Sequence, residues 1–270
     1  MTPVQVHNFS YGILNPGLGY LMSCLGGFLG LRCITRARAY TRWLRAGWLL
    51  IASVAIGATG IWLMHFVAML GFTIPGQQIM YNVRLTLISM LVAVAVVAIG
   101  LFIVGYSDGG RLPVLAGGVI IGIGVATMHY LGMAAMSMPD TTRYNPFLVA
   151  LSVLIAIVAG TGALWAGLRV GGLWSTLGAS LVMGVAVSGM HYTGMAAMRV
   201  YAGGGMTMPG APAESFLLPL LLGVTIGTFL MTLFIALSPN EDEILDDARL
   251  TESLGPEAGS QLGIFRRVPF

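Results

Sequence analysis

Seven long apolar runs constrain the fold of this chain more than any other feature. About twenty consecutive apolar residues cross the roughly 30 Å hydrocarbon core of a bilayer, where helices satisfy their own backbone hydrogen bonds. Charged residues make up only 9% of the chain, against about 25% in soluble domains. We therefore predict an all-α, polytopic membrane protein whose seven transmembrane helices lie at Tyr11–Leu31, Gly47–Leu70, Leu85–Gly105, Leu112–Met136, Phe147–Leu168, Leu173–Met198 and Phe216–Leu237.

The arginines predict the orientation in the cell membrane. The first apolar run is followed by the densest basic group, which consists of Arg32, Arg36, Arg38, Arg42 and Arg45. Because basic loops stay cytoplasmic, we expect the N-terminus outside and, after seven crossings, the C-terminus in the cytoplasm. The basic excess then reflects orientation in the lipid bilayer and gives no sign of a nucleic-acid partner.

Three parts of the chain are expected: an outer N-terminal segment at 1–10, the membrane domain at 11–237 and an acidic cytoplasmic tail at 238–270. The tail holds seven acids against three arginines, a composition typical of a short helix and a disordered end. The outer loops carry Pro and Gly, which predict short irregular connections. Two of these loops also share the pairs Tyr81-Asn82 and Tyr144-Asn145.

One short stretch occurs three times, at 188–198, 126–136 and, more loosely, 62–70. Its histidines, His65, His129 and His191, are separated by about two helices, so each repeat of two crossings restores the same orientation. We predict three parallel two-helix units about a pseudo-threefold axis, with the seventh helix outside the repeat. All three histidines then lie at similar depth near the outer ends of even-numbered helices.

Methionines accompany each histidine at fixed spacing. A methionine four residues later shares the helical face of each histidine, and these methionines are Met69, Met133 and Met195. Those that directly precede the histidines point about 100° away and suit packing or indirect support; they are Met64, Met128 and Met190. Thioethers select Cu(I), and imidazole suits copper, zinc, iron and nickel. With no carboxylate or thiolate nearby, this donor set favours copper.

Other interpretations stay open. The histidines could form a hydrogen-bonded packing cluster with methionine as a filler, although ionisable residues inside a bilayer are usually functional. Two of them could be axial ligands of a haem redox protein, or His/Met rungs could serve a copper transporter or channel. His7 is either a solvated residue or, if the N-terminal segment folds back, an additional ligand.

The third copy of the motif reads Met190-His191-Tyr192-Thr193, and from about residue 8 to 237 the chain resembles the MHYT domain family. This resemblance implies a bacterial membrane sensor that binds a metal, with copper expected, near the outer face and through it senses a diatomic gas such as O2, CO or NO. The implied metal ligands are the three histidines with the six methionines named above. The first copy reads Met-His-Phe-Val and the second has Leu131 in place of threonine.

Members of this family are often fused to cytoplasmic domains that make or degrade cyclic di-GMP. Residues 238–270 are too short for such a domain, and the membrane part shows neither an acid/base pair nor a phosphate-binding loop. We therefore expect a signalling protein that is not an enzyme and that acts through a separate cytoplasmic partner.

Overall fold

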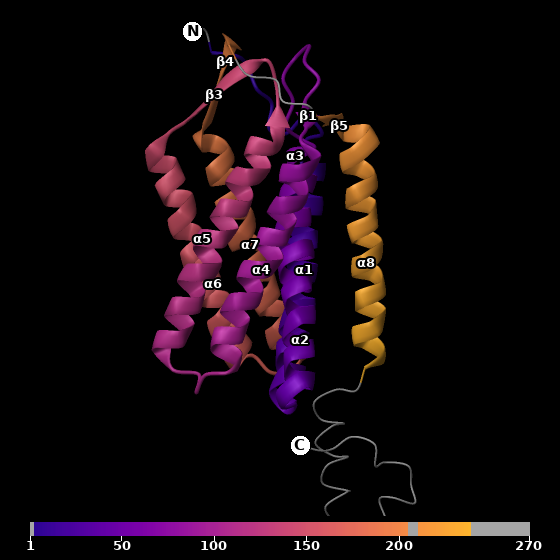
Figure 1. Ribbon diagram of the computed structural model, residues 1–270, viewed down its shortest axis with the longest axis vertical. Helices are drawn as coiled ribbons and strands as arrows, with labels where there is room; N and C mark the ends of the chain where they lie inside the picture. Colours follow the sequence, from indigo (N-terminus) through magenta and orange to yellow (C-terminus); the bar gives the residue numbers. More distant parts are fainter. Residues whose placement is uncertain (1–2, 205–209, 239–270) are drawn as a thin grey trace, which may run out of the picture.

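The computed structural model describes residues 3–204 and 210–238, so the predicted tail beyond Ser238 lies outside the described residues. Seven helical crossings stand side by side (Figure 1), each long and apolar enough to span a membrane. This confirms the all-α, multi-pass membrane fold. In chain order the crossings are α1 (Leu14–Ala39); α2 (Arg42–Val54), η1 (Ala55–Leu63) and α3 (Met64–Met69) together; α4 (Val83–Gly105); α5 (Arg111–Ala135); α6 (Pro146–Arg169); α7 (Leu173–Ala197); and η2 (Ala213–Leu217) with α8 (Leu218–Leu237).

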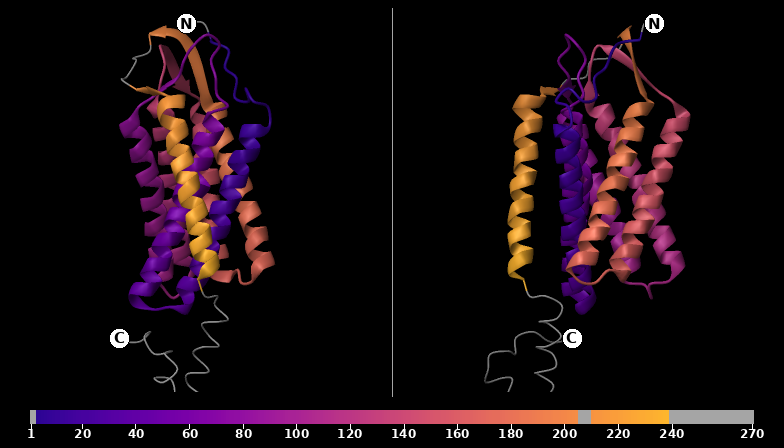
Figure 2. Two further views of the ribbon diagram at one scale, coloured as in Figure 1. Left: turned by 90° about the vertical axis from the view of Figure 1, so that its right-hand side faces the viewer. Right: turned by 180° about the vertical axis from the view of Figure 1, so that it is seen from behind.

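Six of these crossings form a closed ring. Following the contacts around it, α1 packs on α7, α7 on α6, α6 on α5, α5 on α4, α4 on the second crossing, and the second crossing on α1. Crossings of even and odd number therefore alternate, as three parallel two-helix units require. The seventh crossing, α8, stands at the edge of the ring against η1 and α1 (Figures 1 and 2).

Close packing within the ring uses glycines that are spaced four residues apart on one helix, Gly26 with Gly30 and Gly118 with Gly122. A side chain at Gly26 would overlap the backbone of Gly60, and one at Gly122 would overlap the backbone of Ile157. In lipid, such small surfaces let helices approach closely and gain van der Waals contact. These glycines therefore pack helices within the chain.

The basic group lies on helices, contrary to the expected loop. Helix α1 continues to Ala39, and only Tyr40 and Thr41 separate it from α2. The arginines satisfy carbonyls at the ends of neighbouring helices: Arg36 donates to Ile235 O at 2.8 Å, and Arg45 donates to Gly105 O at 3.3 Å. An arginine at the end of a membrane helix can extend its long side chain to polar partners such as these carbonyls. The helix therefore continues past the point where its apolar run stops. We call this end of the bundle the arginine end.

Among the described residues, the connections at the opposite end contain short paired strands, which the expectation of irregular loops missed. β2 (Met136–Ser137), β1 (Met80–Tyr81) and β5 (Ala211–Pro212) form one antiparallel sheet in that order, and β3 (Asp140–Tyr144) pairs with β4 (Met198–Gly204) in another. The strands β2 and β4 start directly where α5 and α7 end. The backbone N–H and C=O groups that follow each helix therefore form hydrogen bonds with a neighbouring strand. Figure 1 shows them gathered with the N-terminus at one end, the strand-capped end.

The repeated Tyr-Asn pairs fix one unit to the next. The side chain of Asn82 caps α4 by accepting from Leu85 N at 3.0 Å, and Asn145 caps α6 by accepting from Phe147 N at 3.0 Å. Their backbone N–H groups donate, both at 2.8 Å, to Ala135 O and Ala197 O. The third and fifth crossings, α4 and α6, thus each start beside the last turn of the following histidine-bearing helix, α5 and α7 respectively.

Candidate metal centre

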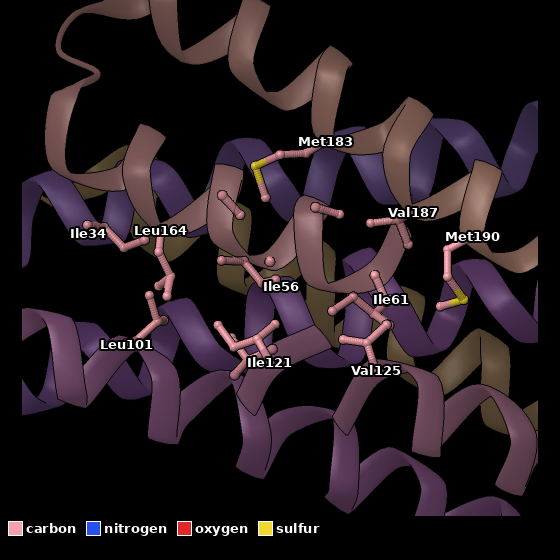
Figure 3. A pocket seen from close by; sticks show the side chains of 15 residues that line it. Ile34, Ile56, Ile61, Leu101, Ile121, Val125, Leu164, Met183, Val187 and Met190 are labelled. Atoms are coloured by element: carbon pink, nitrogen blue, oxygen red, sulfur yellow. The ribbon is translucent and has the colours of Figure 1, made fainter. Parts of the chain in front are cut away.

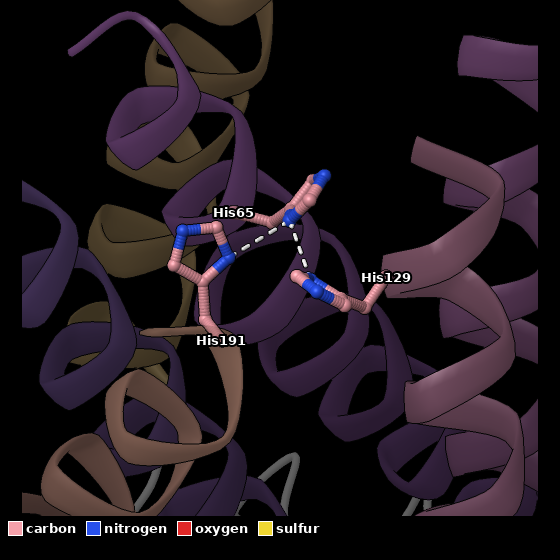
Figure 4. Close-up of side chains that lie close together, drawn as sticks. All are labelled: His65, His129 and His191. Atoms are coloured by element: carbon pink, nitrogen blue, oxygen red, sulfur yellow. Dashed lines mark hydrogen bonds between the residues drawn. The ribbon is translucent and has the colours of Figure 1, made fainter. Parts of the chain in front are cut away.

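The three repeated histidines meet inside the bundle near the strand-capped end. They project from α3, α5 and α7, the even-numbered crossings, which contact one another pairwise. Each side chain is almost completely buried, with at most 1% of its surface exposed. Figure 4 shows the three rings facing a common centre.

The rings form a nearly symmetric triangle. The Nδ1 atom of His65 lies 3.0 Å from Nδ1 of His191 and 3.1 Å from Nδ1 of His129. The ring centroids are 4.9, 5.0 and 5.1 Å apart, and every pair of rings is close to perpendicular. The second and third histidines thus approach the first through the same atom.

Hydrogen bonds alone satisfy this cluster poorly. In a neutral imidazole one ring nitrogen is an N–H donor and the other is an acceptor. Nδ1 of His65 therefore either donates one hydrogen bond or accepts one, and it cannot make a full hydrogen bond to both neighbouring rings. The Nε2 atoms of all three rings are buried without a partner. Each unsatisfied buried group costs about 1–3 kcal/mol. A cation at the centre would bind the Nδ1 lone pairs in place of the shared hydrogen bond; the ring protons would then lie on Nε2, where the structure shows no acceptor.

The distances between the donor nitrogens suit such an ion. Two nitrogens held at about 2.0–2.1 Å by one tetrahedral ion lie about 3.3 Å apart, close to the 3.0 and 3.1 Å observed. One donor nitrogen from each ring can be chosen so that all three lie within 4.8 Å of one another. The three histidines can therefore each offer one nitrogen to a shared ion.

Glycines on neighbouring helices hold the rings in place. A Cβ at Gly132 would strike Nε2 of His65, and a Cβ at Gly194 would strike Nε2 of His129. Both glycines follow their own motif histidine by three residues, and Ala68 occupies this place in the first copy. The rings of His65 and His129 therefore each contact the glycine of the next repeat, a relation that sequence spacing within one helix does not reveal.

Aromatic pairs cover the cluster on its strand-capped side. The residue after each histidine packs on a second ring: Phe66 on Tyr81 with centroids 6.2 Å apart, Tyr130 on Tyr144 at 5.7 Å, and Tyr192 on Phe9 at 5.4 Å. Tyr81 is buried, and this burial raises the pKa of its phenol above the usual range. The buried pair of Phe66 and Tyr81 limits the access of water from that end. The repeated Tyr81 and Tyr144 were the sequence signal for two of the three pairs.

The other predicted ligands are placed as follows. Met69, Met133 and Met195 are buried one helical turn after the histidines, and Met64, Met128 and Met190 are also buried; sulfur ligation by these residues stays a prediction. His7 is exposed and pairs through its backbone with Thr73, with N–O distances of 2.9 and 2.8 Å. The structure does not bring its side chain to the three histidines.

Three consecutive segments, residues 59–117, 122–180 and 184–242, match the sequence model of MHYT, described as a bacterial signalling protein N-terminal repeat. The chain belongs to the MHYT family. The family repeat is phased differently from the predicted two-helix units, because its third copy contains α8 whereas α1 lies outside all three copies. As predicted, the seventh helix α8 lies outside the ring of six crossings, although the third family repeat includes it.

Several curated MHYT relatives are signalling proteins. The bifunctional diguanylate cyclase/cyclic di-GMP phosphodiesterase MucR of Pseudomonas aeruginosa is 38% identical over 70% of this chain and 28% of its own length. The cyclic di-GMP phosphodiesterase NbdA of the same organism is 38% identical over 81% of this chain and 28% of its own length. The signalling protein YkoW of Bacillus subtilis is 30% identical over 73% of this chain and 25% of its own length. No solved structure matches the chain.

These relatives correct the expectation that the protein is not an enzyme, because two of them are named as enzymes of cyclic di-GMP turnover. The chain spans about a quarter of the length of these relatives, and the match lies in the membrane repeat. Enzymatic activity is therefore a property of named relatives, and the residues described here form a membrane signalling domain.

Proposed function

We propose that this MHYT domain binds one copper ion through His65, His129 and His191 and controls a cytoplasmic signalling output. The observation that carries the proposal is the convergence of three buried Nδ1 atoms, two pairs of which lie 3.0 and 3.1 Å apart. Imidazoles with thioethers nearby favour copper, and the ion would supply a position where a small molecule such as O2, CO or NO can bind. The three histidines hold the ion, and the buried pair of Phe66 and Tyr81 limits the access of water.

Two alternatives fit the geometry less well. A haem with two axial histidines needs a macrocycle between the rings, but here the ring centroids are only about 5 Å apart. A copper channel needs polar or sulfur groups along a path, but the space on the arginine side of the cluster offers sulfur only at Met183 and Met190 and is otherwise lined by aliphatic side chains and glycine. An ion beyond these two residues would lose its hydration without compensation.

A path from the metal centre to the output leads through α8. The π-helix η1 ends two residues before His65, and its Thr59 shares a buried hydrogen bond of 2.7 Å with Thr228 of α8. At the arginine end, Trp48 stacks on Phe234 of α8 with centroids 5.8 Å apart. A shift of His65 on ligand binding would therefore act on η1 and move α8, the last helix before the C-terminal part of the chain. π-helical segments are frequent at functional sites.

With the N-terminus outside and α8 ending in the cytoplasm, the output lies on the cytoplasmic side. The names of MucR and NbdA support cyclic di-GMP turnover as the controlled process, carried out by an enzyme domain or partner on that side.

Metal analysis of the purified protein by mass spectrometry, together with its ultraviolet–visible spectrum, tests the metal site. We expect near-stoichiometric copper in the wild type and loss of copper in the His129→Ala/His191→Ala variant. His7→Ala is the matched control because His7 is exposed and its side chain does not join the three histidines. The His7→Ala variant should keep its copper. Unchanged copper in the double variant, or a haem spectrum, would refute the site assignment.

A further inference from the structure

An apolar cavity lies inside the bundle on the arginine side of the histidines. Its volume is about 40 Å³, and its walls come from α1, η1, α4, α5, α6 and α7. Near the metal centre it is bounded by Ile61, Val125 and Val187, each four residues before one motif histidine. Figure 3 shows these three side chains with Met190 at one end of the cavity and Leu101 and Leu164 at the other. The cavity therefore ends one helical turn from the histidine cluster.

The size and walls of the cavity define what it can hold. A site for one water needs about 10–15 Å³ and two to four polar partners. A volume of about 40 Å³ thus has room for a molecule of two or three heavy atoms. Its side chains are aliphatic apart from those of Met183 and Met190, whose thioethers are only weak acceptors, and none of them is a hydrogen-bond donor. Apolar cavities of this kind stay dry and take up small apolar molecules.

Two thin walls separate this cavity from the surroundings. Ala159, Ala163 and Met183 line both the cavity and a groove of about 610 Å³ between α6 and α7. The groove lies on the membrane-facing surface, where Val158 and Val182 are 64% and 68% exposed. At the arginine end, Ile34, Leu101 and Leu164 line both the cavity and a vestibule of about 410 Å³.

The wall toward the lipid is the easier one to pass. It consists of two small alanines and one methionine, whose unbranched side chain rearranges readily. The other wall consists of three larger, branched aliphatic side chains, and its vestibule contains Arg38, Arg45 and Asp108. An apolar molecule is also favoured in hydrocarbon over water, so its concentration is higher at the groove.

We propose that small apolar molecules dissolved in the bilayer reach the histidine cluster laterally, through the α6–α7 groove, past Met183 and into the cavity. The cavity is a binding site for an uncharged molecule of about diatomic size, held beside Val125, Val187 and Met190. This inference deepens the proposed function in that it identifies the class of ligand and its route to the metal centre.

Xenon is a suitable probe because it is apolar and its binding needs no metal. Metal-free protein in lipid nanodiscs, with labelled isoleucine and valine methyl groups, would be placed under xenon pressure. We expect saturable shifts of the methyl signals of Ile121, Val125 and Val187. Ala159→Phe should slow xenon exchange about tenfold, which corresponds to an added barrier of about 1.4 kcal/mol. Met183→Ala, which removes bulk and so preserves the fold more readily, should speed exchange.

Ala150→Phe is the matched control, because Ala150 is an exposed residue of α6 that lines neither the groove nor the cavity; it should leave the exchange rate unchanged. Absence of xenon shifts would overturn the binding site. Exchange that is slowed by Leu101→Phe but insensitive to Ala159→Phe and Met183→Ala would overturn the lateral route. Because metal is absent throughout, these results are independent of copper binding, and a failure of copper binding would leave them standing.

Discussion

Replacing Gly194 by alanine tests whether contacts between repeats set the geometry of the metal centre. The new Cβ would lie 2.8 Å from Cδ2 and 3.2 Å from Cε1 of His129, and closer still to Nε2. Ordinary van der Waals contact is 3.4–4 Å, so the ring must withdraw by at least the difference of about 0.6 Å. That shift changes the position of Nδ1 of His129, which lies 3.1 Å from Nδ1 of His65.

The energies oppose one another in a measurable way. Overpacking of this kind costs about 1–3 kcal/mol, whereas alanine gains about 1 kcal/mol over glycine in a helix. The net loss of stability for Gly194→Ala is therefore about 0–2 kcal/mol. Copper affinity should fall further, by about 10–100-fold, as is typical when a group that orients a metal ligand is changed.

Gly189→Ala on the same helix is the control. Its Cβ would meet nothing within 4 Å, so this variant should be as stable as the wild type or more stable, with unchanged copper affinity. The assays are thermal unfolding and titration of Cu(I) against a chromophoric competitor. If Gly194→Ala binds copper as tightly as Gly189→Ala, the geometric reasoning is refuted.

Three further predictions concern the cap, the edge helix and the metal. Asn82→Ala removes the side-chain cap of α4 and should cost about 0.5–2 kcal/mol; an unchanged melting temperature would contradict this role. Thr228→Val removes the buried bond to Thr59, so it should loosen α8 and weaken the coupling of copper to cyclic di-GMP turnover, measured in membranes from cells that contain the output enzyme; identical copper responses would refute the proposed path. Removing copper with a chelator should lower the free energy of unfolding by about 2.7 kcal/mol relative to protein with free copper at 100 times its Kd. This difference should be absent in the His129→Ala/His191→Ala variant. An unfolding free energy of the wild type that does not change on chelation would contradict copper binding.

The sequence determined the number of crossings, because hydrophobicity over about twenty residues is a local property. It also determined that three histidines lie at one depth, because the motif recurs after every second crossing. Helix ends were predicted less well. The extension of α1 to Ala39 depends on arginines that bind carbonyls of other helices, and the strands at the loops depend on pairing between segments that lie far apart in the chain.

Only the tertiary structure decided that the histidines touch. A spacing of 64 or 62 residues fixes depth but leaves the angle of each helix about the axis open, and the alternating ring of crossings is what turns α3, α5 and α7 toward one centre. The same arrangement places Gly132 against His65 and Gly194 against His129, contacts between repeats that no periodicity within one helix predicts. It also leaves His7 exposed and leaves a cavity beside the cluster, because cavities arise from the packing of many helices and not from any one of them.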